Sequence, residues 1–229
     1  MADTGDRQAI VTGCSSGIGH AIATGLLEDG WRVCGVSRRA PEIGSSRFSH
    51  IAADLVDPAA PGRVSDAAGP AFALVHAAGL LRTGSIDEMN FDDGEAMWRL
   101  HVDAAARLVQ AVVPRMPDGG RILLLGSRVS HGAPGKALYA ASKAAIGGLA
   151  RSFAAELVGR RITVNVIAPG ATHTPMLNDP VRQSVPPRLP PMGRFVQPEE
   201  ISAVTAFLLS DMAGSITGQE ITVCGGASL

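Results

Sequence analysis

Short runs of apolar and β-branched residues alternate along the chain with longer segments in which apolar residues recur every three or four positions. The short runs are typical of strands buried on both faces, and the longer spacing is typical of amphipathic helices. We expect strands at residues 8–13, 32–37, 47–54, 72–79, 121–127, 162–170 and 220–226. We expect helices at residues 19–30, 92–116, 138–159 and 198–211. This alternation predicts an α/β domain built on a doubly wound, parallel sheet.

Two segments depart from this alternation. Residues 55–71 contain three prolines and two glycines, so any helix there should be short or absent. Residues 175–197 hold six of the chain's 15 prolines, from Pro175 to Pro191, and should form a stiff, extended loop. A long loop in a compact domain often covers an active site, and a solvated connection is the alternative. Without internal repeats or a linker of different composition, we expect one domain over residues 1–229.

The composition narrows the classes of partner. The 229 residues are 46% hydrophobic and carry 20 basic against 21 acidic side chains, which favours a globular protein that binds neither nucleic acid nor membranes. No apolar run approaches the ~20 residues of a membrane helix, and the first residues lack the apolar centre of a secretory signal, so we expect a cytoplasmic location. Three widely separated cysteines indicate free thiols rather than disulfides or a zinc site.

A glycine-rich turn, TGCSSGIG at residues 12–19, follows the first expected strand and directly precedes a helix. Its glycines permit a tight turn and remove side chains that would obstruct a phosphate, while the helix N-terminus offers free N–H groups to an anion. A dinucleotide pyrophosphate fits this pattern. The spacing differs from the G-x-G-x-x-G fingerprint of larger dinucleotide-binding folds, and a purely structural strand-to-helix turn would look similar.

The chain's only tyrosine, Tyr139, stands four positions before Lys143 in the segment YAASK, so a helix places both on one face. A free tyrosine titrates near pH ~10, and a neighbouring ammonium favours its phenolate. Lowering that pKa to about 7 would take roughly 4 kcal/mol. The pair therefore suits acid–base chemistry, although Tyr-x-x-x-Lys alone also occurs by chance.

In order and spacing, these pieces resemble the short-chain dehydrogenase/reductase family over almost the whole chain. The matching segments are residues 12–19, Asp54, 76–79, Ser127, 139–143, 165–174, 192–201 and 215–226. The resemblance implies one Rossmann-like domain of about seven strands that transfers a hydride between a nicotinamide cofactor and a small ketone or secondary alcohol. It also implies a homo-oligomer. Apolar or small residues on several faces of the helices at 102–116 and 137–158 favour a tetramer.

The resemblance also implies the catalytic roles. Tyr139 is the acid/base, Lys143 assists it and holds the nicotinamide ribose, and Ser127 orients the substrate oxygen. Ser127 lies 12 residues before Tyr139, one fewer than is usual in the family, which leaves Ser130 as a competitor. We keep Ser127 because it closes a strand, and a strand end is a more rigid platform than a loop.

Four histidines lie near the expected site. His101 stands where the family usually has an asparagine of the proton relay, and it is either a relay group or a packing residue of its helix. His76 also replaces a common asparagine and is expected to alter local hydrogen bonds rather than the chemistry. His131 and His173 fall in loops, where either could touch substrate. No pair of histidines has metal-ligand spacing, so we expect no catalytic metal.

Cofactor choice depends on the end of the second strand, where NAD enzymes usually place a carboxylate against the ribose hydroxyls. Here Ser37 precedes Arg38 and Arg39, and a guanidinium binds a 2′-phosphate that a carboxylate would repel. We favour NADP(H) and keep NAD(H) as the alternative, because Ser16 stands where many NADP-dependent relatives have a basic residue. The residues expected to hold the cofactor are Gly13, Ser15, Ser16, Gly17, Ile18, Gly19, Ser37, Arg38, Arg39, Asp54, Leu55, Ala77, Ala78, Gly79, Tyr139, Lys143, Pro169, Gly170, Thr172 and Thr174.

Two further functions stay open. One is an NAD-dependent diol or sugar-alcohol dehydrogenase, and the other is a nucleotide-binding protein that has lost catalysis, an idea that rests on His101. An apolar wall over the substrate is expected from Met176, Leu177, Leu189, Met192 and Phe195 of the proline-rich loop.

Overall fold

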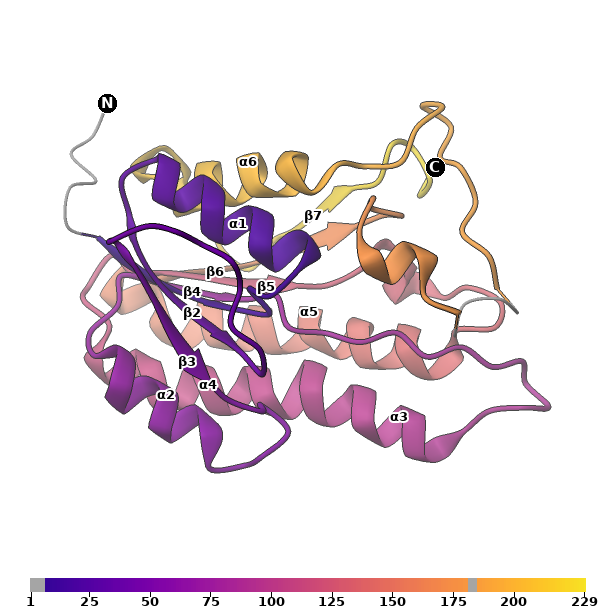
Figure 1. Cartoon of the computed structure of the whole chain (residues 1–229), viewed down its shortest axis with the longest axis horizontal. Helices are drawn as coiled ribbons and strands as arrows, with labels where there is room; N and C mark the ends of the chain where they lie inside the picture. Colours follow the sequence, from indigo (N-terminus) through magenta and orange to yellow (C-terminus); the bar gives the residue numbers. More distant parts are fainter. Residues whose placement is uncertain (1–6, 181–184) are drawn as a thin grey trace.

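Seven parallel strands form one sheet in the order β3-β2-β1-β4-β5-β6-β7 (Figure 1). The strands are β1 (Gln8–Thr12), β2 (Arg32–Ser37), β3 (Phe48–Ala52), β4 (Ala73–His76), β5 (Arg121–Leu125), β6 (Thr163–Pro169) and β7 (Glu220–Val223). The computed structural model describes residues 7–180 and 185–229. All seven expected strands are confirmed, each within the range that its sequence pattern predicts.

Helices cover both faces of this sheet. The helices are α1 (Gly17–Glu28), α2 (Ala60–Ala68), α3 (Phe91–Trp98), α4 (Ala104–Val112), α5 (Ala137–Leu157) and α6 (Pro198–Leu209). In Figure 1, α1 and α6 lie side by side above the sheet, and α2, α4 and α5 lie below it. Successive strand residues point to opposite faces of the sheet. Ile10 therefore packs against α2, α4 and α5, and Val11 packs against α1 and α6. The doubly wound fold is therefore confirmed, and α2 is short, as expected.

The expected helix at 92–116 is interrupted. A π-helical turn, Arg99–Asp103, joins α3 to α4 and buries His101 and Val102. A π turn accommodates an extra residue and changes the partners of the backbone carbonyls. The carbonyl oxygen of Leu100 in this turn accepts a hydrogen bond from His76 at 3.0 Å, across from the end of β4. The apolar spacing of a continuous helix did not show this irregularity.

The proline-rich segment connects the end of β6 to the start of α6. A short bridge between Thr172 and Val196 closes its base, where the N–H of His173 donates to the carbonyl of Val196 at 2.8 Å. Its described residues include a 3-10 turn, Pro175–Asn178, and a stretch of mostly irregular backbone from 185 to 197. Whether this segment covers substrate stays a prediction. Among the described residues, no helix is long and apolar enough to cross a membrane.

The sheet order places the candidate site. The chain proceeds outward from β1 to β2 and β3 on one side, and from β4 to β7 on the other. At such a switch point the connections after β1 and β4 leave in opposite directions, and a crevice opens at the carboxyl edge between them. The glycine-rich turn follows β1, the segment HAAG includes the end of β4, and Ser127 lies two residues beyond β5.

Candidate active site

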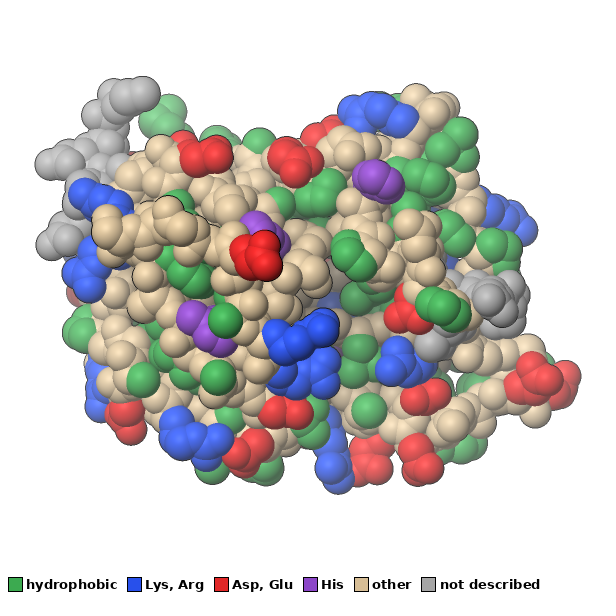
Figure 2. All heavy atoms as spheres, viewed as in Figure 1, with side chains coloured by type: hydrophobic (Ala, Val, Ile, Leu, Met, Phe, Trp, Pro, Cys, Tyr) green, Lys and Arg blue, Asp and Glu red, His purple; other side chains and the backbone are tan. Residues whose placement is uncertain are grey.

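A cleft runs along this carboxyl edge and consists of two adjoining cavities. We call the end with the glycine-rich turn and the end of β2 the nucleotide end, and the end with Ser127, Tyr139 and Lys143 the catalytic end, after the roles predicted for these residues. Residues that line both are Ile18, Ala77, Gly79, Leu80, Thr174 and Met176. Every residue predicted for catalysis or cofactor binding lines one cavity or the other. On the face seen in Figure 2, acidic and basic side chains are interspersed around the hollowed centre.

The glycine-rich turn is built for close approach of backbone to backbone. Gly13 has a φ of +70°, and a Cβ there would lie 2.8 Å from the Cα of Ala78 on the neighbouring β4 connection. A Cβ at Gly19 would meet the carbonyl oxygen of Gly13. Any side chain at these positions would therefore push the turn outward. Helix α1 begins at Gly17, so its unpaired N–H groups face the nucleotide end of the cleft.

Thr12 and His76 fix the two connections together. The hydroxyl oxygen of Thr12 accepts hydrogen bonds from the backbone N–H groups of Ala77 at 3.1 Å and Ala78 at 3.0 Å. Because Nε2–H of His76 must donate to the carbonyl of Leu100, Nδ1 accepts from the Thr12 hydroxyl at 3.0 Å. Burial lowers the pKa of His76 to about 4, so the ring is neutral at pH 7. This geometry supports the structural role expected for His76.

At the nucleotide end, the hydroxyl of Ser37 is already engaged. It donates to the carbonyl of Arg39 at 2.7 Å, and His50 Nε2 lies 3.0 Å away from it. Ser37 therefore shapes the turn, and its hydroxyl has little capacity left for a ribose. The Arg38 and Arg39 side chains, by contrast, are exposed at the cavity wall. Asp54 lies on the same wall and accepts the backbone N–H of Val56 at 3.1 Å.

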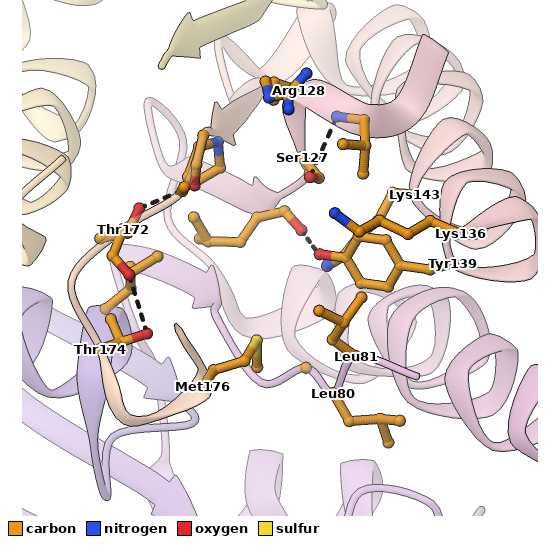
Figure 3. A pocket seen from close by; sticks show the side chains of 18 of the residues that line it. Leu80, Leu81, Ser127, Arg128, Lys136, Tyr139, Lys143, Thr172, Thr174 and Met176 are labelled. Atoms are coloured by element: carbon orange, nitrogen blue, oxygen red, sulfur yellow. Dashed lines mark hydrogen bonds between the residues drawn. The ribbon is translucent and has the colours of Figure 1, made fainter. Parts of the chain in front are cut away.

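At the catalytic end, α5 presents Tyr139 from its first turn and Lys143 from its second (Figure 3). The ammonium of Lys143 donates to the carbonyl of Leu125 at 2.7 Å and lies 5.9 Å from the centre of the Tyr139 ring. Lys143 is 5% exposed, and this burial lowers its pKa to about 7. The side chain therefore balances between ammonium and amine near neutral pH. Lys143 and Lys136 are the only lysines of the chain, and both line this cavity.

Ser127 caps the 3-10 turn Arg128–His131, accepting the N–H of Val129 at 3.3 Å, and faces the catalytic cavity. Its competitor, Ser130, does not line this cavity, and its hydroxyl donates to Glu220 at 3.4 Å. The geometry therefore favours Ser127. Strand β5 ends at Leu125, two residues earlier than the sequence pattern indicated.

His101 is fully buried and held by both ring nitrogens. Because the N–H of Leu80 donates to Nε2 at 3.1 Å, Nδ1 carries the proton and donates to the Ser142 hydroxyl at 3.0 Å. Ser142 in turn donates to the carbonyl of Tyr139 at 2.8 Å. The His101 and Tyr139 rings meet edge to face, with centres 5.7 Å apart. Burial, followed by the positive charge of Lys143, lowers the pKa of His101.

Of the remaining residues predicted to line the site, some face the cavity and others do not. Thr172 and Thr174 lie on the wall opposite Tyr139 (Figure 3), where Met176 is the one member of the expected apolar set that lines the cavity. Leu177 is buried elsewhere, whereas Leu189 and Met192 are exposed. His131 and His173 are exposed and do not line the cavity. Sequence reasoning missed several residues that do: Leu80, Leu81, Arg128, Lys136, Pro187 and Arg188. Within the described ranges, no three His, Cys, Asp or Glu residues gather as a metal site.

A family model described as enoyl-(acyl carrier protein) reductase matches residues 13–228. The chain belongs to the short-chain dehydrogenase/reductase family. Among curated relatives, 3-oxoacyl-(acyl-carrier-protein) reductase FabG of Salmonella typhimurium is 36% identical and covers 95% of this chain, with 96% of its own length covered. D-threitol dehydrogenase of Mycolicibacterium smegmatis is 32% identical, with 97% and 93% covered. Membership makes the chain an oxidoreductase that acts on CH–OH groups.

Solved short-chain dehydrogenase/reductase structures share the fold. The ligand-free aldohexose dehydrogenase of Thermoplasma acidophilum superimposes with a TM-score of 0.89 at 26% identity, covering 99% of this chain and 96% of its own. A blue fluorescent protein from a metagenomic library, in complex with NADPH, has a TM-score of 0.85 at 30% identity, with 97% and 98% covered. A 3-ketoacyl-(acyl-carrier-protein) reductase of Brucella melitensis, complexed with NADH, has a TM-score of 0.88 at 27% identity and the same coverage.

Proposed function

We propose that this short-chain dehydrogenase/reductase transfers a hydride between NADP(H) and a ketone or secondary alcohol, with Tyr139 as the acid/base. The observation that carries the proposal is the convergence of Ser127, Tyr139 and Lys143 on one cavity that opens into a glycine-lined nucleotide cleft. The three side chains come from two separate segments of the chain, the turn after β5 and helix α5. Their meeting is therefore a property of the fold rather than of one local motif.

The cleft fits a dinucleotide. Gly13 and Gly19 let the turn pack closely against the β4 connection and against itself, and α1 directs its N-terminus at the nucleotide end of the cleft. Asp54 and Leu55 would flank the adenine, Gly79 would let the backbone pass close to the nucleotide, and Thr172 and Thr174 would hold the nicotinamide carboxamide. When bound, the nicotinamide supplies or accepts the hydride.

The chain's own groups would manage the proton. The Tyr139 hydroxyl would give its proton to the carbonyl oxygen during reduction, or take the hydroxyl proton during oxidation. The Ser127 hydroxyl would hold the same oxygen in position. Lys143 would favour the phenolate when it is charged, and its anchor on the Leu125 carbonyl holds it near the Tyr139 ring.

His101 fits a positioning role better than a proton-carrying one. Both of its ring nitrogens have partners, and its lowered pKa disfavours the protonated ring. Through Ser142 it connects the Leu80 backbone to the first turn of α5, which carries Tyr139. The ring would therefore keep the Tyr139 backbone at a fixed distance from the β4 connection.

NADP(H) is favoured by the nucleotide end of the cleft. Arg38 and Arg39 are exposed there, and no ion pair between either of them and a carboxylate occurs among the described residues. Ser37 replaces the carboxylate typical of NAD enzymes, and its hydroxyl bonds to Arg39 rather than pointing free. A 2′-phosphate would find two guanidinium groups at this edge.

A second function, an NAD-dependent diol or sugar-alcohol dehydrogenase, is supported by the relatives named D-threitol dehydrogenase and aldohexose dehydrogenase. Other relatives are named differently. One is an acyl-carrier-protein reductase, and another is the 2,3-dihydro-2,3-dihydroxybenzoate dehydrogenase of Escherichia coli, which is 32% identical with 99% of both chains covered. The relatives thus share the reaction class and differ in substrate. A non-catalytic nucleotide-binding protein is disfavoured by the intact set of Ser127, Tyr139 and Lys143.

We also propose a homotetramer, with a cytoplasmic location as an accompanying expectation. The side of α5 away from the sheet exposes small residues at helical spacing, Ala141, Ala144, Gly148 and Ala155. Next to it, a groove between α4 and α5 is lined by Val109, Val113, Phe153 and Leu157. Two such helix pairs can pack closely because small side chains let backbones approach.

The decisive experiment is turnover of a panel of cyclic and acyclic ketones, followed by oxidation of NADPH or NADH. We expect NADPH to give the higher kcat/KM. Tyr139→Phe should abolish turnover while cofactor affinity stays near the wild-type value, because phenylalanine keeps the ring and loses only the hydroxyl. A Tyr139→Phe protein that turns over at the wild-type rate contradicts the assigned role. A preference for NADH supports the second function instead.

A further inference from the structure

The catalytic end of the cleft contains three cations besides Lys143. Arg128, Lys136 and Arg188 line it, and none of them lines the nucleotide end. No aspartate or glutamate lines this cavity among residues 7–180 and 185–229. The whole chain has a formal net charge of −1, so this local excess of positive charge does not reflect the overall composition.

Each of the three cations comes from a different part of the fold. Arg128 directly follows Ser127 and is half-buried, and its Nη1 donates to the carbonyl of Ala227 near the C-terminus at 3.2 Å. Figure 3 shows Arg128 beside Ser127 at the rim of the pocket. Lys136 precedes α5 and stands three residues before Tyr139, so it lies close to the face that carries the tyrosine. Arg188 is exposed and arrives from the proline-rich segment.

Elsewhere, seven of the described arginines pair with carboxylates. Arg7 bonds to Asp211, Arg63 to Asp57 and Arg194 to Glu200, all at the surface. No such ion pair is present for Arg128 or Arg188 among the described residues. The contact between Arg128 and the Ala227 carbonyl orients the guanidinium without neutralising its charge. Like charges around one cavity repel each other, and an anion bound between them would relieve that repulsion.

We infer that the substrate carries an anionic group, a carboxylate or a phosphate, in addition to the carbonyl or hydroxyl that reacts. This inference rests on the proposed function for the position of the reacting carbon, and it extends that function to the substrate class. The anionic group would lie on the Arg128 side of the cavity, beyond Ser127 and away from the nucleotide end. Arg128 is the anchor because it is half-buried and held in place, whereas the exposed Arg188 contributes mainly to attraction over distance.

Binding to the cofactor-saturated protein tests the inference without requiring turnover. Benzoate, phenyl phosphate and benzamide have the same ring and differ in charge, and calorimetry at low salt gives their dissociation constants. We expect at least one anion to bind fivefold or more tightly than benzamide. Arg128→Gln should raise the dissociation constant of that anion about tenfold, in keeping with the loss of a charge-assisted hydrogen bond. The dissociation constant of benzamide should stay unchanged.

Three further variants separate charge from folding. Arg128→Lys keeps the charge and should retain most of the anion preference. Arg188→Gln should raise the dissociation constant of the anion by a smaller factor, about two to three, because solvent screens an exposed charge. Arg63→Gln removes an exposed arginine of α2, which does not line either cavity, and should change nothing. Tighter benzoate indicates a carboxylate substrate, and tighter phenyl phosphate indicates a phosphate ester.

Turnover of 4-oxopentanoate and its uncharged amide distinguishes failure of this inference from failure of the proposed function. If both ketones are reduced with equal kcat/KM and neither anion binds better than benzamide, the inference is overturned and the oxidoreductase function stands. If the anions bind through Arg128 but no ketone or alcohol reacts with either cofactor, the proposed function fails and the anion site stands. Loss of anion preference in Arg63→Gln as well as Arg128→Gln would also overturn the inference.

Discussion

Replacing Lys143 with methionine should change how the stability of the protein depends on pH. In the folded protein the pKa of Lys143 is about 7, whereas the ordinary value is 10.5. Because the side chain is only 5% exposed, little solvent screening reduces the effect. This difference in pKa corresponds to about 5 kcal/mol as the full penalty for burying the ammonium.

The sign of the pH dependence follows from proton binding. Between pH 7 and 10.5 the unfolded chain binds a proton at Lys143 that the folded protein does not, so wild-type stability rises with pH across this window. Lys143→Met has no such proton. The stability of Lys143→Met minus that of the wild type should therefore decrease by about 2 kcal/mol from pH 7 to pH 9. Lys143→Met also removes the hydrogen-bond donor of the Leu125 carbonyl. This loss changes the difference in stability by the same amount at every pH value.

Urea unfolding of the cofactor-free proteins at pH 6, 7, 8 and 9, followed by circular dichroism at one protein concentration, measures this difference. Lys136→Met is the matched control, because it removes the chain's other lysine, which is only partly buried. Its stability curve should run parallel to that of the wild type. Parallel curves for Lys143→Met and the wild type over the whole range would refute the reasoning about burial.

Three other outcomes are expected. Arg38→Asp should raise the dissociation constant of NADPH more than tenfold and that of NADH much less, as measured by fluorescence titration, and equal effects would contradict the 2′-phosphate assignment. His101→Ala should lower stability by about 1–3 kcal/mol, since the Leu80 N–H loses its acceptor, while the inflection of the pH–rate profile stays in place; a moved inflection would restore the relay role. Light scattering at micromolar concentration should give four times the 23.5 kDa chain mass, and Gly148→Arg, where a Cβ meets nothing within 4 Å, should reduce it. A wild-type monomer would exclude the tetramer.

The sequence predicted the strands well because each is a short apolar run with its own turn signals, and such signals are local. It also placed Tyr139 and Lys143 on one face, since helical spacing alone decides that. The π turn at His101 was not predictable in the same way. The turn is accompanied by a hydrogen bond from His76 to the Leu100 carbonyl, and these residues are 24 positions apart. A pattern of apolar spacing contains no record of that contact.

The same reason explains what was missed in the cavity. No cluster of basic residues appears in the sequence, because Arg128, Lys136 and Arg188 come from three segments that only the fold brings together. Ser37 is a different case. Its position at the end of β2 was predicted correctly, but its hydroxyl donates to the Arg39 carbonyl and lies within hydrogen-bond distance of His50 on β3. The position of Ser37 along the strand could be predicted from the sequence, whereas the hydrogen bonds of its hydroxyl depend on tertiary neighbours.

The chain has only two lysines, and because both line the catalytic cavity, labelling of lysine side chains is directed to the candidate active site. Apart from the terminal amine, an acylating dye or an amine-coupling resin has no other primary amine to attack. Lys143, whose pKa burial lowers to about 7, has a larger unprotonated fraction at pH 8 than an ordinary lysine, and its 5% exposure restricts access to small reagents. Immobilisation through either lysine would therefore be expected to block the enzyme. A small amine-directed probe, in contrast, would report whether cofactor occupies the cleft.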